Sequence, residues 1–148
     1  MIYLASDHAG FELKEKIKFY LVQLGYEVED FGAHFYDETD DYPDFISKAA
    51  EAVSKDPENS KGIIFGGSGQ GEAMVANRKK GVRAAVVYSF NENIVRLSRE
   101  HNDANILSLG ARFLSEDEAK QIVRLWLDTK FSKEERHIRR INKIDLMT

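Results

Sequence analysis

Cysteine is absent from this chain of 148 residues. The absence excludes disulfide bonds, thiolate metal sites and a cysteine nucleophile together. No run of 18 apolar residues occurs, so we expect no membrane-spanning helix. The chain enters an apolar stretch at Ile2 without a preceding basic segment. From this we expect neither export nor membrane attachment, and we place the protein in the cytoplasm.

Basic residues form no run long enough to follow a nucleic-acid backbone, and the formal net charge is −4. We therefore expect no nucleic-acid partner. Hydrophobic residues make up 43% of the chain and charged residues 31%. A chain of this length and composition buries one proper core but not two independent ones. We expect a single domain over residues 1–148.

Short apolar runs alternate with segments of helical periodicity. The runs that predict strands are Ile2–Ala5, Tyr26–Phe31, Gly62–Phe65, Val82–Tyr88 and Ile106–Leu109. The first helix ends at Gly25, and Pro43 suits the first turn of the second helix. Each strand is apolar on both faces, and each connection is long enough for a crossover helix. The pattern predicts a three-layer α/β/α, doubly wound, Rossmann-like fold with a five-stranded parallel sheet.

Residues 115–148 predict two further helices. Ile138, Ile141 and Ile144 recur three apart in the second of them, with basic residues between. No sixth strand follows for this helix to cover. We therefore expect the extra C-terminal helix to lie across a neighbouring subunit.

A glycine-rich turn follows the third predicted strand and opens a helix. Its sequence is Gly-Gly-Ser-Gly-Gln-Gly-Glu over residues 66–72. Glycines let the backbone approach a ligand closely, and successive free amides at a helix start favour negative charge. Tight packing of a strand on a helix is the alternative reason for such glycines. Because the glycines stand at the carboxyl end of a strand, we favour a phosphate or oxyanion cradle.

Three known motifs do not fit this turn. A nucleotide P-loop needs Lys and then Ser or Thr after its last glycine, where Glu72 would repel phosphates. A dinucleotide fingerprint needs a different glycine spacing and an acidic residue after the next strand, where Tyr88 and Ser89 stand. A hydrolase elbow needs a glycine at Gln70. Ser68 is therefore interpreted as a hydrogen-bond donor.

The turn presents a carboxylate beside backbone amides. Removing a proton next to a carbonyl needs a base near the carbon and donors near the oxygen that becomes negative. Glu72 and the amides supply both kinds of group. An ordinary acidic residue favoured by the helix dipole is an equal reading of Glu72 from this motif alone.

Other polar clusters accompany the turn. They are Ser6-Asp7-His8-Ala9-Gly10-Phe11, Asp41-Tyr42-Pro43, Arg99-Glu100-His101-Asn102-Asp103-Ala104-Asn105, Gly110-Ala111-Arg112, and Arg136 with Arg140. In this order, from Met1 to about Ile144, the clusters resemble ribose-5-phosphate isomerase type B and its sugar-phosphate isomerase relatives.

The resemblance implies a role for each cluster. Its catalytic residues are Glu72 as the base, Ser68 at the enediolate oxygen, and His101 with Asp7 in ring opening. Its substrate-binding residues are His8, Tyr42, Gly67, Gly69, Gln70, Gly71 and Asn102. Its phosphate-binding residues are His8, Arg112, Arg136 and Arg140. The last two arginines would come from the second subunit of a homodimer with shared sites, and pairing of dimers into tetramers is left open.

Many members of the family have a cysteine base at the position of Gly66. A second branch has a glycine-rich turn whose glutamate is the base, and Glu72 stands at that place. The implied reaction is a ribose 5-phosphate to ribulose 5-phosphate isomerisation through a cis-enediolate, without metal or cofactor. A six-carbon substrate such as allose or galactose 6-phosphate, a non-catalytic sugar-phosphate sensor and a flavodoxin-like nucleotide binder stay open as alternatives. We expect Asp7-His8 and His101-Asn102 both to lie at carboxyl ends of strands.

Overall fold

A computed structural model describes residues 1–147; Thr148, the last residue of the expected domain, lies outside the described residues. Five parallel strands form one sheet in the order β2-β1-β3-β5-β4. Their bounds are β1 Ile2–Ser6, β2 Val28–Asp30, β3 Lys61–Gly66, β4 Ala84–Val87 and β5 Ile106–Gly110. The central pair places Gly66 opposite Gly110 at the carboxyl ends of β3 and β5.

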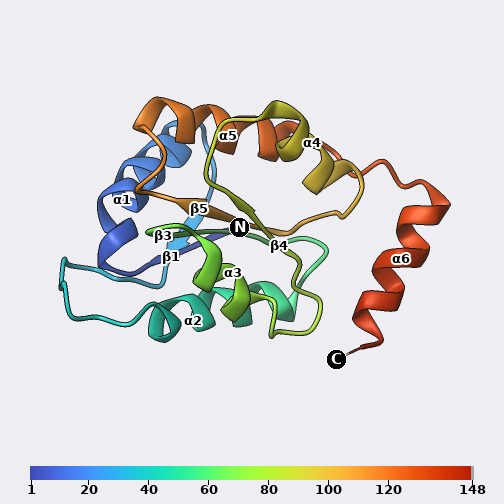
Figure 1. Cartoon of the computed structure of the whole chain (residues 1–148), viewed down its shortest axis with the longest axis horizontal. Helices are drawn as coiled ribbons and strands as arrows, with labels where there is room; N and C mark the ends of the chain where they lie inside the picture. The colour runs from blue at the N-terminus through green and yellow to red at the C-terminus, as the bar shows by residue number, and fades with distance from the viewer. Residues whose placement is uncertain (148) are drawn as a thin grey trace.

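Helices cover both faces of this sheet (Figure 1). Helices α1, α4 and α5 lie on one face, and α2 and α3 lie on the other. The helix bounds are α1 His8–Gln23, α2 Tyr42–Lys55, α3 Gln70–Ala76, α4 Glu92–Glu100, α5 Glu116–Asp128 and α6 Glu135–Asp145. The predicted three-layer fold and the extra C-terminal helix are thus confirmed.

Two hydrophobic cores lie on opposite faces of the sheet because its strands are apolar on both sides. Phe65 of β3 packs in one core with Ile17 of α1 and Trp126 of α5. Its neighbour Ile64 packs in the other with Ile46 of α2. Successive strand residues point to opposite faces, so one strand serves both cores.

Strands β2 and β4 are shorter than the predicted Tyr26–Phe31 and Val82–Tyr88. The Tyr26 amide donates to the Leu21 carbonyl at the end of α1, so Tyr26 belongs to the turn. The Arg83 amide donates to Oδ1 of Asn105 at 2.8 Å, and a side chain thus replaces the strand partner there. In both cases another partner takes the backbone group before the strand ladder begins: a local turn at Tyr26 and a distant side chain at Arg83.

Helix α6 stands apart from the two helical layers (Figure 1). Two of its residues, His137 and Ile141, are buried, and most of the others are exposed. The His137 ring stacks on the His101 ring at 4.2 Å between centroids. Whether α6 crosses a neighbouring subunit stays a prediction.

No helix among residues 1–147 has the length and apolar character that crossing a membrane requires.

Candidate active site

The glycine-rich turn connects β3 to α3 and is fastened by neighbouring strands and turns. Gly69 begins the helix with φ +80°, a conformation that favours glycine. Ser108 of β5 donates its hydroxyl to the Gly69 carbonyl at 2.6 Å. The Ala111 and Arg112 amides donate to the carbonyls of Gly66 and Gly67 at 2.8 and 3.1 Å. These bonds hold the backbone around the turn in one arrangement.

Glu72 is buried in the first turn of α3, with 4% of its surface exposed. Its carboxylate lies directly over Gly66, where a Cβ added to residue 66 would collide with it. Burial raises the pKa of Glu72, and the charge of Asp7 raises it further. An acid favoured only by the helix dipole, the alternative reading of Glu72, would not need this degree of burial. Glu72 is a partly desolvated carboxylate beside the turn.

Asp7 and His8 follow β1, which pairs with β3, and so reach the same edge of the sheet. Asp7 caps α1 by accepting a hydrogen bond from the Gly10 amide at 3.2 Å. The prediction that Asp7 and His8 lie at a carboxyl end is confirmed. Asp7 is buried beside Glu72, whereas His8 is half-buried.

Tyr42 and Arg112 flank the turn. The Tyr42 ring lies against Gly71, where an added Cβ would come within 2.7 Å of the phenol. The Arg112 guanidinium lies against Gly67, 3.2 Å from where a Cβ would stand. Arg112 is exposed, and its charge acts on His8. Tyr42 and Arg112 therefore both lie against the glycine-rich turn, and their roles in binding stay a prediction.

His8 has a partner that the sequence analysis missed. Its ring Nδ1 lies 2.6 Å from Oδ1 of Asp40, and its backbone amide donates to the same oxygen at 3.0 Å. The hydrogen bond to Asp40 raises the pKa of His8. Asp40 belongs to an acidic loop, and nothing in that run of acids distinguishes it from its neighbours.

Asp7, His8 and Asp40 each offer a possible metal ligand atom, and these atoms lie within 4.8 Å of one another. The short contact between His8 and Asp40 is a hydrogen bond, so a cation would have to displace the proton that the two share.

His101 and Asn102 do not lie where the sequence predicted. They follow α4 and precede β5, which places them at the amino end of the strands. In a parallel sheet, a residue between a helix and the next strand always lies at that end. The five residues of β5 separate the two edges by at least about 13 Å. Within one chain, His101 therefore does not border the space that contains Glu72.

Arg136 and Arg140 belong to the same distant group. Both are exposed on α6, the helix whose His137 stacks on His101. The chain thus carries two separate sets of predicted site residues. The carboxyl-edge set is Asp7, His8, Tyr42, Gly67, Ser68, Gly69, Gln70, Gly71, Glu72 and Arg112, and the amino-edge set is His101, Asn102, Arg136 and Arg140.

Part of the stretch from Arg99 to Asn105 is structural. The buried Arg99 guanidinium donates to the carbonyls of Thr129 and Ala104 and to Asp103. The Asn105 amide donates to the carbonyls of Gly81 and Pro57. These residues hold the corner before β5, where Asn102 is exposed and His101 is half-buried against His137.

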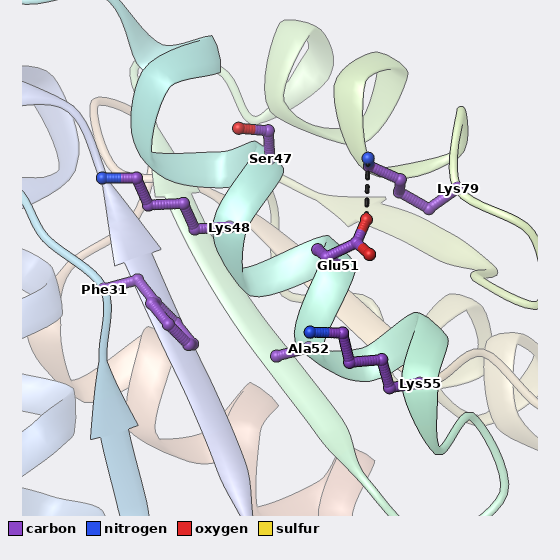
Figure 2. A pocket seen from close by; sticks show the side chains of 7 residues that line it. All are labelled: Phe31, Ser47, Lys48, Glu51, Ala52, Lys55 and Lys79. Carbon is purple, nitrogen blue, oxygen red and sulfur yellow. Dashed lines mark ion pairs between the residues drawn. The ribbon is translucent and has the colours of Figure 1, made fainter.

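Figure 2 shows a pocket lined mainly by side chains of α2. Its lining contains none of the predicted site residues, and Lys79 within it pairs with Glu51 at 2.8 Å. The lining residues are Phe31, Ser47, Lys48, Glu51, Ala52, Lys55 and Lys79. The chemistry of the turn is therefore not located in this pocket.

Comparison with known proteins agrees with the geometry. The family model described as Ribose/Galactose Isomerase matches residues 2–144. A protein of Mycolicibacterium paratuberculosis named ribose-5-phosphate isomerase B is 45% identical over 141 residues, covering 95% of this chain and 87% of that protein.

Solved structures give the same result. The ribose-5-phosphate isomerase B of Mycoplasma genitalium with bound ribulose-5-phosphate superposes with a TM-score of 0.94 at 41% identity, covering 99% of this chain and 94% of that one. The Clostridium thermocellum ribose-5-phosphate isomerase B superposes with a TM-score of 0.91 at 46% identity, covering 99% and 95%.

Proposed function

The chain belongs to the ribose/galactose isomerase family, and from this we propose that it interconverts ribose 5-phosphate and ribulose 5-phosphate with Glu72 as the base. The observation that carries the assignment of the base is the buried Glu72 carboxylate over Gly66. The relatives named ribose-5-phosphate isomerase B, one of them with bound ribulose-5-phosphate, support the substrate. The protein is a sugar-phosphate isomerase.

The reaction moves one proton between neighbouring carbons of the open-chain sugar. Ionised Glu72 takes the proton from the second carbon, and the electron pair moves onto the carbonyl oxygen to form a cis-enediolate. Glu72 then returns the proton to the first carbon. The hydroxyl proton on the oxygen of the second carbon passes to the oxygen of the first carbon, which leaves the carbonyl group on the second carbon. The Ser68 hydroxyl and the amides of Gly67 to Gly71 stabilise the negative oxygen. The raised pKa of Glu72 strengthens it as a base once it is ionised.

The phosphate end of the substrate would be held by His8 and Arg112 on the same edge of the sheet. Charge-assisted hydrogen bonds to a phosphate are strong and directional. Binding energy from this non-reacting end would keep the reacting carbons against Glu72.

The amino-edge residues enter the site only through a second copy of the chain. One chain cannot place its own His101 beside its own Glu72, because the two residues lie at opposite ends of the strands. We therefore assign ring opening to the partner subunit's His101 and sugar contacts to the partner subunit's Asn102. The partner subunit's Arg136 and the partner subunit's Arg140 would complete the phosphate clamp. Their exposure on α6 supports this assignment.

The proposal takes residues 1–148 as one isomerase domain, supported by the single sheet that both hydrophobic cores share. The cytoplasmic location expected from the sequence stays a prediction. A six-carbon sugar phosphate is the competing substrate, and rates with ribose, allose and galactose phosphates decide between them.

The variant Glu72→Gln tests the base directly. With ribose 5-phosphate in deuterated water, proton NMR of the wild type should show exchange of the hydrogen on the second carbon. The variant should retain binding and lose this exchange by a factor of about 10²–10⁴. Glu92→Gln is the matched control, since Glu92 lies in the first turn of α4 and is exposed. Equal exchange by wild type and Glu72→Gln would overturn the assignment, and no exchange by either would favour a sensor.

A further inference from the structure

We propose that Asp40 is a positioning residue that keeps the His8 imidazole as a doubly protonated donor for the phosphate end of the substrate. The inference rests on the proposed function for the identity of the ligand, a phosphate monoester. Its evidence is the geometry of Asp40, His8 and the loop that joins β2 to α2.

Asp40 binds His8 at two points through one oxygen. Oδ1 accepts from the His8 backbone amide at 3.0 Å and lies 2.6 Å from the ring Nδ1. The Asp40 side chain is 8% exposed. A carboxylate held this way sets both the start of α1 and the direction of the ring.

The loop that carries Asp40 is braced internally. Asp37 accepts hydrogen bonds from the Thr39 amide at 3.0 Å and the Thr39 hydroxyl at 2.7 Å. The Asp40 amide donates to the Asp37 carbonyl at 3.1 Å. The Tyr36 ring meets the His8 ring edge-on, with centroids 6.1 Å apart. Asp40 therefore reaches His8 from an ordered turn.

The hydrogen bond to Asp40 determines whether Nε2 of His8 can donate a hydrogen bond to a ligand. A carboxylate at Nδ1 requires that this nitrogen carry a proton. In the neutral ring, Nε2 would then hold a lone pair, which repels a phosphate oxygen. Only the charged ring has protons on both nitrogens. Asp40 thus allows His8 to donate from Nε2 only as an imidazolium.

The charged groups around His8 favour that state. The hydrogen bond to Asp40 raises the pKa of His8, and the nearby charge of Asp7 adds to it, against burial and Arg112, which lower it. The pKa of nearby Asp37 is lowered mainly by its hydrogen bonds from Thr39, and the charge of His8 adds to this. The raised pKa extends the pH range over which His8 and Arg112 together present positive charge to a phosphate.

The second oxygen of Asp40 supports a role beyond shaping the backbone. Oδ2 is buried and has no hydrogen-bond partner among the described residues. If the only role of residue 40 were to accept the hydrogen bond from the His8 amide, a neutral asparagine would serve equally well. Burying a carboxylate oxygen without a hydrogen bond costs desolvation free energy. The attraction between the Asp40 carboxylate and a positively charged His8 ring offsets this cost.

The variant Asp40→Asn separates charge from shape, since its amide oxygen can still accept from the His8 backbone. Asp41→Asn is the matched control: Asp41 is the adjacent acid, is exposed and makes no side-chain hydrogen bond at the start of α2. Nitrogen-15 NMR of the imidazole ring would follow the titration of His8. We expect Asp40→Asn to lower the pKa of His8 and Asp41→Asn to leave it unchanged. An unchanged pKa in Asp40→Asn would overturn the proposal.

Binding of inorganic phosphate, followed by the same His8 signals, tests recognition without turnover. At pH 8 we expect Asp40→Asn to weaken binding about tenfold, the scale of one charged hydrogen bond. At pH 6 the loss should shrink, because the variant's His8 is then protonated as well. Equal loss at both pH values would show a merely structural role and overturn the proposal.

Turnover separates this proposal from the proposed function. With ribose 5-phosphate, KM of Asp40→Asn should rise about tenfold at pH 8, with a smaller change in kcat. A wild type that does not isomerise, with the NMR results as expected, would refute the isomerase function and leave the role of Asp40 standing. An active wild type with unchanged phosphate binding in Asp40→Asn would refute only the role of Asp40.

Discussion

The Glu72 carboxylate occupies the space directly above the Cα of Gly66, where any side chain at residue 66 would begin. Residue 66 must therefore lack a side chain as long as Glu72 keeps this position. Family members with a cysteine base at position 66 would start their side chain in the same space. A thiol from the strand and a carboxylate from the helix are thus alternatives for one place, and in this chain the Glu72 carboxylate occupies it.

Gly66→Ala should displace the Glu72 carboxylate and lower kcat by about 10²–10⁴, the usual contribution of a positioned base. Circular dichroism should show a folded protein, because the added methyl meets a side chain rather than backbone. Steady-state kinetics with ribose 5-phosphate gives the measurement. The double variant with Glu72→Gln should lose little more than either single variant, since both remove one function. Activity near the wild-type level in Gly66→Ala would contradict the position assigned to the base.

The acidic limb of the pH–rate profile should follow Glu72, which acts only when ionised. Burial and then Asp7 raise its pKa, so activity should fall with decreasing pH at a higher pH than for an ordinary glutamate. Asp7→Asn should move this limb of kcat to lower pH, because it removes the repelling charge while asparagine still caps α1. Asp117→Asn, at an exposed position in α5, is the control and should leave the limb in place. If the acidic limb of kcat does not move in Asp7→Asn, the limb reports the titration of a group other than Glu72.

Two inactive variants should complement each other if the site is shared between subunits. Glu72→Gln and His101→Ala, mixed, unfolded and refolded together, should form heterodimers in which one of the two sites has both native residues. Random pairing of equal amounts makes about one quarter of all sites native, so the mixture should have about one quarter of the wild-type activity. Each variant refolded alone is the control and should stay inactive. A mixture that is no more active than its components would place His101 outside the shared site.

Lys14 is fully buried and pairs with Asp30 at 2.6 Å, while Lys18 reaches the same carboxylate at 2.8 Å. Lys14→Met should lower the free energy of unfolding by about 2–4 kcal/mol, since it leaves a largely buried carboxylate with one partner fewer. Urea denaturation measures this change. Lys16→Met is the control; its ion pairs are exposed, and it should cost less than about 1 kcal/mol.

The same ion pair predicts how stability depends on pH. Burial alone would raise the pKa of Asp30, but hydrogen bonds from Lys14 and Lys18 outweigh it and lower the pKa. A lowered native pKa contributes stability above the unfolded pKa and loses it as the pH falls through the native value. The difference in free energy of unfolding between wild type and Lys14→Met should therefore become smaller in acid. A difference that stays constant down to strongly acidic pH would mean that Lys14 stabilises the protein by packing and not by its ion pair.

The layers of the fold were predictable because they depend on local patterns. Apolar runs on both faces of a strand require cover on both faces, and Phe65 and Ile64 indeed point to opposite cores. The glycine-rich turn was equally readable, since four glycines after a strand have few other uses. Strand bounds were less predictable. β4 begins only at Ala84 because the Arg83 amide binds the Asn105 side chain, and no local sequence pattern predicts so distant a partner.

The positions of His101 and Asp40 were decided by long-range contacts. His101 stands in a sequence stretch typical of the family, yet the parallel order of the sheet carries it to the amino edge. Asp40 is one acid among several, and it is distinguished only by the return of its loop to the start of α1.

The sequence by itself determined which groups are present: a carboxylate after a glycine turn, no thiol, and a basic last helix. It also determined the layered fold, because hydrophobic periodicity acts within each element. Only the tertiary structure decided which groups meet. Glu72 is buried over Gly66, a distant loop gives His8 its partner, and the length of the strands separates His101 from Glu72 within one chain. Such distances depend on how strands are ordered in space, and chain order alone does not contain them.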